Sequence, residues 1–192
     1  MQDKYIPPNP PIEGWMSENE LQWLYERGKE HAFIAEIGCW FGRSTHALLS
    51  GNEKNKNAID RKVYVIDTFK GSPSEPIAHA AAKTQNVQGE FKHNCGMFGN
   101  LVLFPGSSLD YVRAFSDGDL DMVFIDGEHT KEALLADLKA WVPKVRLCGL
   151  ISGHDRMWPG VKEALVEFFG VMPAKAVDGI WAIQKEAELS IL

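Results

Sequence analysis

Charged side chains in this sequence recur at one kind of position, within or directly after short apolar segments. Carboxylates and imidazoles at such positions can take a proton from a substrate or bind a metal ion. If the apolar segments are parallel strands, their ends meet at one edge of a sheet, where ligands of open α/β sheets bind. The members of this set are Glu36, Asp67, Asp126, His129, His154 and Asp155.

The apolar segments have the length and composition of buried strands. Residues 119–126 are almost continuously apolar, as expected for a strand covered on both faces. Helical patterns separate the segments, so the order is five β–α repeats that predict an α/β fold with a mostly parallel sheet. The expected strands are 33–37, 62–67, 101–104, 119–126 and 145–152, closed by an antiparallel hairpin of 174–177 and 180–184 around Asp178-Gly179.

The first strand leads into a glycine turn and a helix. The pattern is E-x-G-x-x-x-G-x-S, from Glu36 through Gly38 and Gly42 to Ser44. Glycine is needed where φ is positive or where a Cβ would collide with a ligand. The dinucleotide fingerprint G-x-G-x-x-G is absent. An acid two residues before the first glycine would repel a pyrophosphate, and it suits an ammonium group or a bound cation.

The second strand ends in Asp67, followed by Thr68. In nucleoside-binding α/β folds a carboxylate at this place accepts hydrogen bonds from ribose hydroxyls. Asp67 lies 25 residues after Gly42, near the expected distance. The alternative is that Asp67 ends the strand by capping the next turn.

The glycine turn resembles motif I of the class I S-adenosylmethionine-dependent methyltransferases. Residues 124–130 (FIDGEHT) and 149–155 (GLISGHD) narrow the resemblance to the subfamily of macrocin-type sugar O-methyltransferases and cephalosporin-hydroxylase-like proteins, over about residues 33–185. It implies a Rossmann-like seven-stranded sheet with one reversed strand, and methyl transfer from S-adenosyl-L-methionine, in many members to oxygen. The implied cofactor-binding residues are Glu36, Gly38, Gly42, Ser44, Asp67, Thr68, Ser107, Ser108 and Asp126.

The resemblance also implies a divalent metal site. Asp126 and Asp155 match two metal-ligand positions of metal-dependent members, whereas His154 replaces a carboxylate or carboxamide. Mg²⁺ prefers oxygen ligands, while an Asp, His, Asp set would suit Mn, Fe or Zn. In the metal-free alternative, His154 or His129 is the general base and Asp155 orients it. The structural alternative has His129 capping a helix and His154 bonding to backbone.

Two other functions remain open at this point. A nicotinamide-dependent dehydrogenase on a related fold would conflict with Glu36 and the missing third glycine. A non-catalytic S-adenosylmethionine-binding module would keep the fold but have its acceptor cleft filled by side chains. Nucleic-acid methylation is disfavoured by the net charge of −6 and by Asp126-Gly127 in place of an N/D-P-P-Y or Pro-Cys motif.

Length and composition predict one α/β domain. The chain has 192 residues, no apolar run long enough to span a bilayer and no signal-peptide pattern, so we expect a cytoplasmic protein. The expected partner is a small-molecule acceptor, with no nucleic acid and no membrane. A homo-oligomer is possible. Cys39 and Cys148 are expected to be buried free thiols.

The N-terminal region, 1–32, is expected to be an arm and a helix preceding the methyltransferase domain, 33–192. Four prolines between positions 7 and 11 predict an extended arm that either lies on the core or covers the active site. Ser17 to Glu20 form a capping box.

Residues 70–99 are hard to interpret: 76–83 looks helical and 90–100 irregular. We expect Trp40 and Trp158 in the core, and Asp137 at a polar contact.

Overall fold

The computed structural model describes residues 3–186, so the last six residues of the expected 33–192 domain lie outside it. Its centre is a seven-stranded sheet in the order β3-β2-β1-β4-β5-β7-β6. β1 to β5 run parallel, and β7 is antiparallel to both its neighbours. The strands are β1 (Phe33–Ile37), β2 (Lys62–Asp67), β3 (Leu101–Pro105), β4 (Leu120–Ile125), β5 (Val145–Gly153), β6 (Ala174–Val177) and β7 (Ile180–Gln184). The predicted fold class is confirmed.

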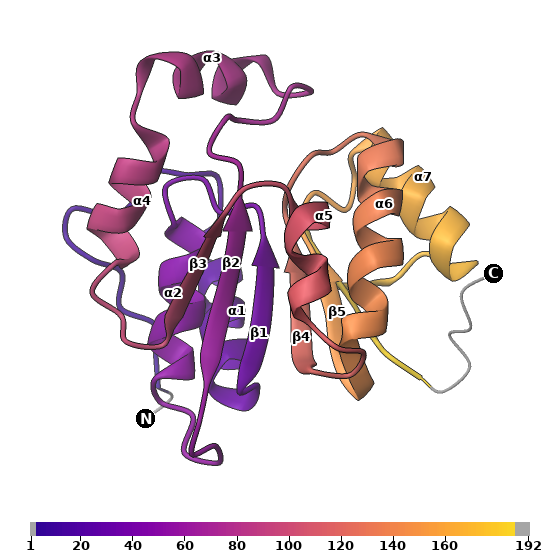
Figure 1. Cartoon of the computed structure of the whole chain (residues 1–192), viewed down its shortest axis with the longest axis horizontal. Helices are drawn as coiled ribbons and strands as arrows, with labels where there is room; N and C mark the ends of the chain where they lie inside the picture. Colours follow the sequence, from indigo (N-terminus) through magenta and orange to yellow (C-terminus); the bar gives the residue numbers. More distant parts are fainter. Residues whose placement is uncertain (1–2, 187–192) are drawn as a thin grey trace.

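Helices cover both faces of the sheet (Figure 1). They are α1 (Glu18–Glu30), α2 (Arg43–Asn52), α3 (Pro76–Thr84), α4 (Val87–Cys95), α5 (Ser108–Tyr111), α6 (Lys131–Trp141) and α7 (Pro159–Phe169), with short 3₁₀ turns at Val112–Ala114 and Val142–Lys144. None of these helices is long and apolar enough to cross a membrane.

Alternation along the strands divides the core in two. In β1, Ala35 and Ile37 belong to the cluster beneath α6 and α7, whereas Ile34 belongs to the cluster beneath α1 and α2. Because successive side chains of a strand point to opposite faces, Glu36 must also face the α2 side. This parity decides what Glu36 can contact.

The strand order reverses between β1 and β4. After these two strands the chain continues in opposite directions, from β1 into α2 and from β4 into α6. Such a switch point opens a crevice outside the carboxyl ends of the strands, which we call the carboxyl edge. Helix α3 lies beyond the tips of β1 and β2 in Figure 1, and so it stands over this edge. The fold therefore brings residues 38, 67, 126 and 154 to one place.

Two expectations from the sequence are wrong. Residues 87–95 form helix α4 within the stretch expected to be partly irregular, because Asn86 caps its start by accepting a hydrogen bond from Gly89 N, 3.0 Å away. Cys148 is exposed, with φ of 60°, because β5 deviates from regular register against β4 between residues 145 and 150. Cys39 is buried, as expected.

Candidate functional site

One cavity of about 560 Å³ runs along the carboxyl edge. Its walls come from the glycine turn, the ends of β2, β4 and β5, the segment 71–78, the loop before α5 and residues 13–16 of the N-terminal arm. The candidate residues that line it are Gly38, Ser44, Asp67, Thr68, Ser107, Ser108, Asp126, His129, His154 and Asp155. Two others, Glu36 and Gly42, do not.

The two glycines of the turn are required by backbone conformation and packing. Gly38 has φ of 84°, and a Cβ on it would lie 2.2 Å from the carbonyl oxygen of Asp126. Gly42 has φ of 92°, and a Cβ would lie 2.6 Å from Cys95 Sγ. Positive φ favours glycine at both positions. Gly38 thus lets β1 and β4 approach at the edge, while Gly42 lets α4 pack behind the turn.

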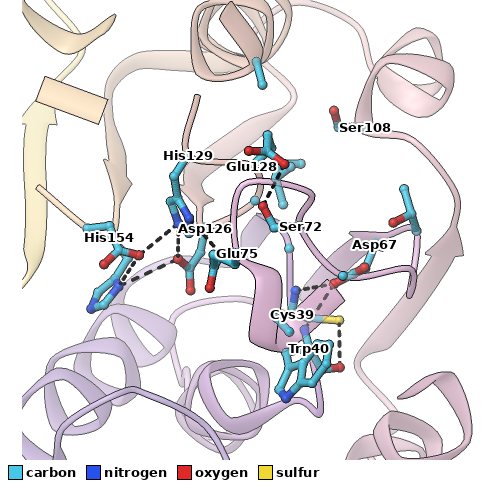
Figure 2. Close-up of a pocket in the computed structure, with 18 of the residues that line it drawn as sticks. Cys39, Trp40, Asp67, Ser72, Glu75, Ser108, Asp126, Glu128, His129 and His154 are labelled. Atoms are coloured by element: carbon cyan, nitrogen blue, oxygen red, sulfur yellow. Dashed lines mark hydrogen bonds and ion pairs between the residues drawn. The ribbon is translucent and has the colours of Figure 1, made fainter. Parts of the chain in front are cut away.

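Asp67 holds the glycine turn in shape. Its Oδ2 accepts hydrogen bonds from the backbone N–H groups of Cys39, at 2.7 Å, and Trp40, at 3.1 Å (Figure 2). Its Oδ1 accepts from Phe69 N at 2.6 Å. The turn-capping alternative therefore describes part of what this residue does. A carboxylate has about four acceptor sites, so Asp67 can also accept from hydroxyls in the cavity.

Glu36 departs from the direct cofactor contact that we expected. It is 0% exposed, and its Oε2 accepts a hydrogen bond from Thr45 Oγ1 at 2.5 Å on the α2 face of the sheet. The reason is the alternation of side chains along β1, which points this side chain beneath the turn and away from the cavity. Burial raises the pKa of Glu36 to about 8, although the Ser44 and Thr45 hydroxyls oppose that shift.

The start of α2 offers a site for an anionic group. Gly42 at the N-cap supplies no side-chain acceptor, and the first turn has no acidic residue. Its first backbone N–H groups therefore have no side-chain partner, and Ser44 lines the cavity beside them. At the other end of the cavity, Ser108 Oγ donates a hydrogen bond to Asp137, so Asp137 has a polar contact as expected, but the partner lies on α5 and not on its own helix. Burial raises the pKa of Asp137 to about 6.

Asp126, His154 and Asp155 form a compact cluster at the ends of β4 and β5. One potential ligand atom from each lies within 4.8 Å of the others. His154 Nδ1 lies 3.1 Å from Asp155 Oδ2 and 3.8 Å from Asp126 Oδ1. Asp155 has φ of 54°, a left-handed conformation that turns its carboxylate back toward the cluster. The sequence prediction that these three residues converge is confirmed.

His129 joins the same cluster from the loop after β4. Its Nε2 lies 2.9 Å from Asp155 Oδ2, and its Nδ1 lies 2.8 Å from Glu75 Oε1 (Figure 2). Neither ring nitrogen has the geometry of a hydrogen bond, so these contacts are ion pairs. Thr130, and not His129, caps helix α6. The helix-capping alternative for His129 is therefore wrong.

Glu20 of α1 holds the far side of His154. His154 Nε2 and Gly179 N each donate to Glu20 Oε1, at 2.9 and 2.8 Å. The second carboxylate oxygen accepts from Ser17 N, as the capping box predicts. Glu20 is 3% exposed. It thus fixes the imidazole with Nδ1 toward Asp126 and Asp155, and the structural alternative, in which the His154 ring bonds to backbone, is wrong because its partners are carboxylates.

The carboxylates keep both imidazoles protonated. Burial lowers the pKa of His154, but the carboxylates of Asp155 and Glu20 outweigh burial and raise it to about 10. Burial also opposes the charged form of His129, and Asp126, Asp155 and Glu75 together raise its pKa to about 12. An imidazolium donates and does not accept a proton, which counts against both His129 and His154 as the general base at neutral pH.

Aromatic side chains border the cavity. Trp158 is 40% exposed and lies over His129, with ring centroids 4.8 Å apart. Trp15 of the arm is 63% exposed, with its ring centroid 5.8 Å from that of Trp40. Trp40 and Trp158 both line the cavity, and the expectation of a core position is wrong for the exposed Trp158. The signal that could have indicated this for Trp158 is its place directly before Pro159, where α7 begins at the edge of the sheet. For Trp40 the expectation holds in part, because it is partly buried and packs on the small core cluster of Ile12, Phe41 and Val87.

Two segments outside the strands complete the walls. The arm is held by Arg43, whose Nε and Nη1 donate to the carbonyl oxygens of Met16 and Ile12, at 3.0 and 2.6 Å. The segment before α3 is held by Ser72, whose Oγ donates to Glu128 Oε2 at 2.8 Å (Figure 2). The arm therefore covers part of the site, as one of the two sequence interpretations proposed.

Comparison with known proteins identifies the class of this fold and site. Residues 35–156 match the protein family described as "Methyltransferase domain". This chain therefore belongs to that family, the S-adenosylmethionine-dependent methyltransferases that the sequence indicated. The family assignment does not favour a dehydrogenase or a non-catalytic module.

Solved structures share the fold at low sequence identity. The chain is similar to cofactor-bound Rv0187 from MTB, with 17% identity, a TM-score of 0.63 and coverage of 91% of this chain and 84% of that one. The O-methyltransferase NovP has 20% identity and a TM-score of 0.64, over 88% and 78% of the two chains. TomG from Streptomyces achromogenes, an O-methyltransferase in complex with SAM, has 14% identity and a TM-score of 0.58, over 89% and 82%.

Proposed function

We propose that this methyltransferase moves the methyl group of S-adenosylmethionine to a hydroxyl oxygen of a small molecule or sugar, as in the macrocin-type subfamily that its motifs resemble. The observation that supports this most is the continuity of the cavity. A nucleoside-binding end at Asp67 and a polar cluster at Asp126, His154 and Asp155 share one space. Methyl transfer needs donor and acceptor aligned in line, which such a shared space provides.

The chain's own residues fit the donor. Asp67 has acceptor sites left for ribose hydroxyls, and the start of α2 with Ser44 suits the carboxylate of the methionyl group. Ser107 and Ser108 line the end where the adenine would lie. Glu36 lies beneath the turn and outside the cavity, and with a pKa of about 8 it is mostly protonated at neutral pH, so it supports the start of α2 through Thr45 and supplies no charge to the donor.

The cluster also fits a divalent metal. A metal-bound histidine typically donates its second ring nitrogen to a carboxylate, which is how His154 contacts Glu20. Asp126, Asp155 and His154 Nδ1 would hold the ion, and this mixed oxygen and nitrogen set suits Mn²⁺, Fe²⁺ or Zn²⁺ better than Mg²⁺. The ion would replace the proton that Nδ1 carries without it. When bound, such an ion would lower the pKa of the acceptor hydroxyl.

The reaction is a single displacement. The acceptor oxygen attacks the methyl carbon, a C–O bond forms as the C–S bond breaks, and sulfur keeps the electron pair. The hydroxyl proton leaves to Asp126 and from there to solvent, because the two imidazoles hold the pKa of Asp155 far below its usual range and make it a poor base. Asp126 and Asp155 orient the acceptor, while His129 and His154 hold those carboxylates in place.

Titration calorimetry with S-adenosylhomocysteine, with and without Mn²⁺ or Zn²⁺, tests this proposal. We expect saturable binding of S-adenosylhomocysteine, and binding of the metal that is lost in Asp126→Asn. NAD⁺ should not bind. Binding of NAD⁺ without S-adenosylhomocysteine would contradict the proposal.

A further inference from the structure

The acceptor end of the cavity has an unusual charge balance. Acidic side chains outnumber basic ones along the walls, and Glu13, Glu75 and Glu128 add to the carboxylates of the cluster. Among the residues that the structure describes, Arg43 is the one arginine or lysine that lines the cavity. Two of its N–H-bearing nitrogens already bind carbonyl oxygens of the arm.

The positive charges in this region are already paired: the imidazoles of His129 and His154 lie against carboxylates, and Arg43 lies against carbonyl oxygens. A divalent ion at Asp126 and Asp155 would offset those two charges, His129 offsets Glu75, and Glu13 and Glu128 would remain. Glu128 Oε1 is buried without a hydrogen-bond partner, and its Oε2 accepts from Ser72 Oγ. Among the described residues no lysine, arginine or histidine forms an ion pair with this carboxylate, which lines the cavity.

The same region exposes flat apolar surface. Trp158 and Trp15 are large side chains that line the cavity and remain well exposed, Trp158 beside His129 of the cluster and Trp15 beside Trp40 of the glycine turn. Indole faces bind the faces of aromatic rings and of sugars, and both partners bury apolar area without needing charge. Because Trp158 lies over His129, a ring stacked on it would hold its hydroxyl near the ends of β4 and β5.

We propose that the acceptor is an uncharged, ring-shaped molecule with a hydroxyl group, and that the site discriminates against acceptors carrying a phosphate or carboxylate. The inference rests on the proposed function and specifies its substrate class. Hydroxylated aromatic rings and neutral glycosides share this chemistry. Nucleotide-linked sugars and coenzyme A esters do not, because their phosphates would enter a region lined by carboxylates.

Matched pairs of compounds test this proposal in the 192-residue chain, with S-adenosylhomocysteine added for the binding measurements and left out of the turnover assays. One pair is a catechol and its ring-carboxylated analogue, and the other is a methyl glycoside and the nucleoside diphosphate sugar of the same hexose. Ligand-observed NMR measures binding, and conversion of S-adenosylmethionine to S-adenosylhomocysteine measures turnover. The two pairs distinguish the aromatic from the sugar source.

We expect at least one neutral compound to bind, and its anionic partner to bind about 100-fold more weakly or not at all, the scale of like-charge repulsion in a partly buried site. Trp158→Ala should weaken binding of the neutral compound by about 10-fold, while Trp158→Phe, which keeps a ring, should retain most of it. Glu13→Lys should narrow the gap between neutral and anionic compounds.

Equal or tighter binding of the anionic partners would overturn the inference, as would failure of every neutral compound to bind. S-adenosylhomocysteine binding, measured alone, separates the two proposals. If it binds and the neutral compounds do not, only the substrate class is wrong. If it does not bind, the proposed function itself fails.

Discussion

Glu20 Oε1 lies 2.9 Å from His154 Nε2, although the two residues are 134 positions apart in the chain. The contact joins the N-terminal helix to the end of β5, and the same oxygen also accepts from Gly179 in the β6–β7 turn. A single buried carboxylate therefore ties three separate parts of the chain to the candidate catalytic cluster.

Replacing Glu20 should be costly. Glu20→Ala would leave His154 Nε2 and Gly179 N without an acceptor, and we expect the free energy of unfolding to fall by about 2–4 kcal/mol, measured in urea. Glu20→Gln keeps one carbonyl oxygen and should lose less. Glu30→Ala on the same helix removes an exposed ion pair with Arg27 and should change stability by less than about 0.5 kcal/mol. A Glu20→Ala protein as stable as Glu30→Ala would contradict this role.

The buried Glu36 predicts a pH dependence of stability. Its folded pKa of about 8 lies above the usual value of 4.5, so its stabilising contribution is complete below 4.5 and is lost as pH rises through 8. Glu36→Gln removes this dependence. We expect the two proteins to have similar unfolding free energies at pH 5, and Glu36→Gln to be more stable by about 1–4 kcal/mol at pH 9. Urea unfolding of both proteins at pH 5 and pH 9 measures this difference. If the difference in unfolding free energy is the same at the two pH values, the raised pKa of Glu36 is ruled out.

Asp67 should affect both binding and stability. Asp67→Ala removes the acceptor for the N–H groups of Cys39, Trp40 and Phe69, and it removes the proposed ribose contact. We expect the binding free energy of S-adenosylhomocysteine to weaken by about 1–3 kcal/mol, with a stability loss of similar size. Calorimetry and urea unfolding separate the two effects. An unchanged binding affinity would refute the ribose assignment.

Asp155 should matter for turnover more than for cofactor binding. Its φ of 54° is tolerated by asparagine, so Asp155→Asn removes the charge without straining the backbone. We expect turnover to fall about 100-fold or more, with S-adenosylhomocysteine affinity within about 3-fold of the original. Wild-type turnover in Asp155→Asn would show that the Asp155 carboxylate does not orient the acceptor.

The strands and the acids at their ends could be predicted because local pattern determines both. Buried parallel strands read as nearly continuous apolar runs, and topology then brings Asp67, Asp126 and Asp155 to one edge whatever the loops do. The prediction of a direct cofactor contact for Glu36 was wrong because it overlooked the alternation of side chains along β1. Counting from Ile37, which faces the cavity side, that alternation places Glu36 on the opposite face of the sheet.

Long-range partners were beyond the reach of the sequence. Glu20 is fully explained by its capping box, and nothing local indicates that its other oxygen meets His154. Glu75 likewise precedes a short helix in the stretch that was hardest to interpret, and it reaches His129 only because α3 stands over the carboxyl edge. Both partners are set by tertiary packing, which single-sequence patterns do not encode.

The close approach of Gly38 to the Asp126 carbonyl has a consequence for genetic screens. Any larger residue at position 38 would push apart the tips of β1 and β4, and so it would disturb the donor pocket and the acceptor cluster at once. Most variants around this cavity should impair either binding of S-adenosylmethionine or methyl transfer to the acceptor. Substitutions at Gly38 should cause both defects at once, because this one residue packs between the donor pocket and the acceptor cluster.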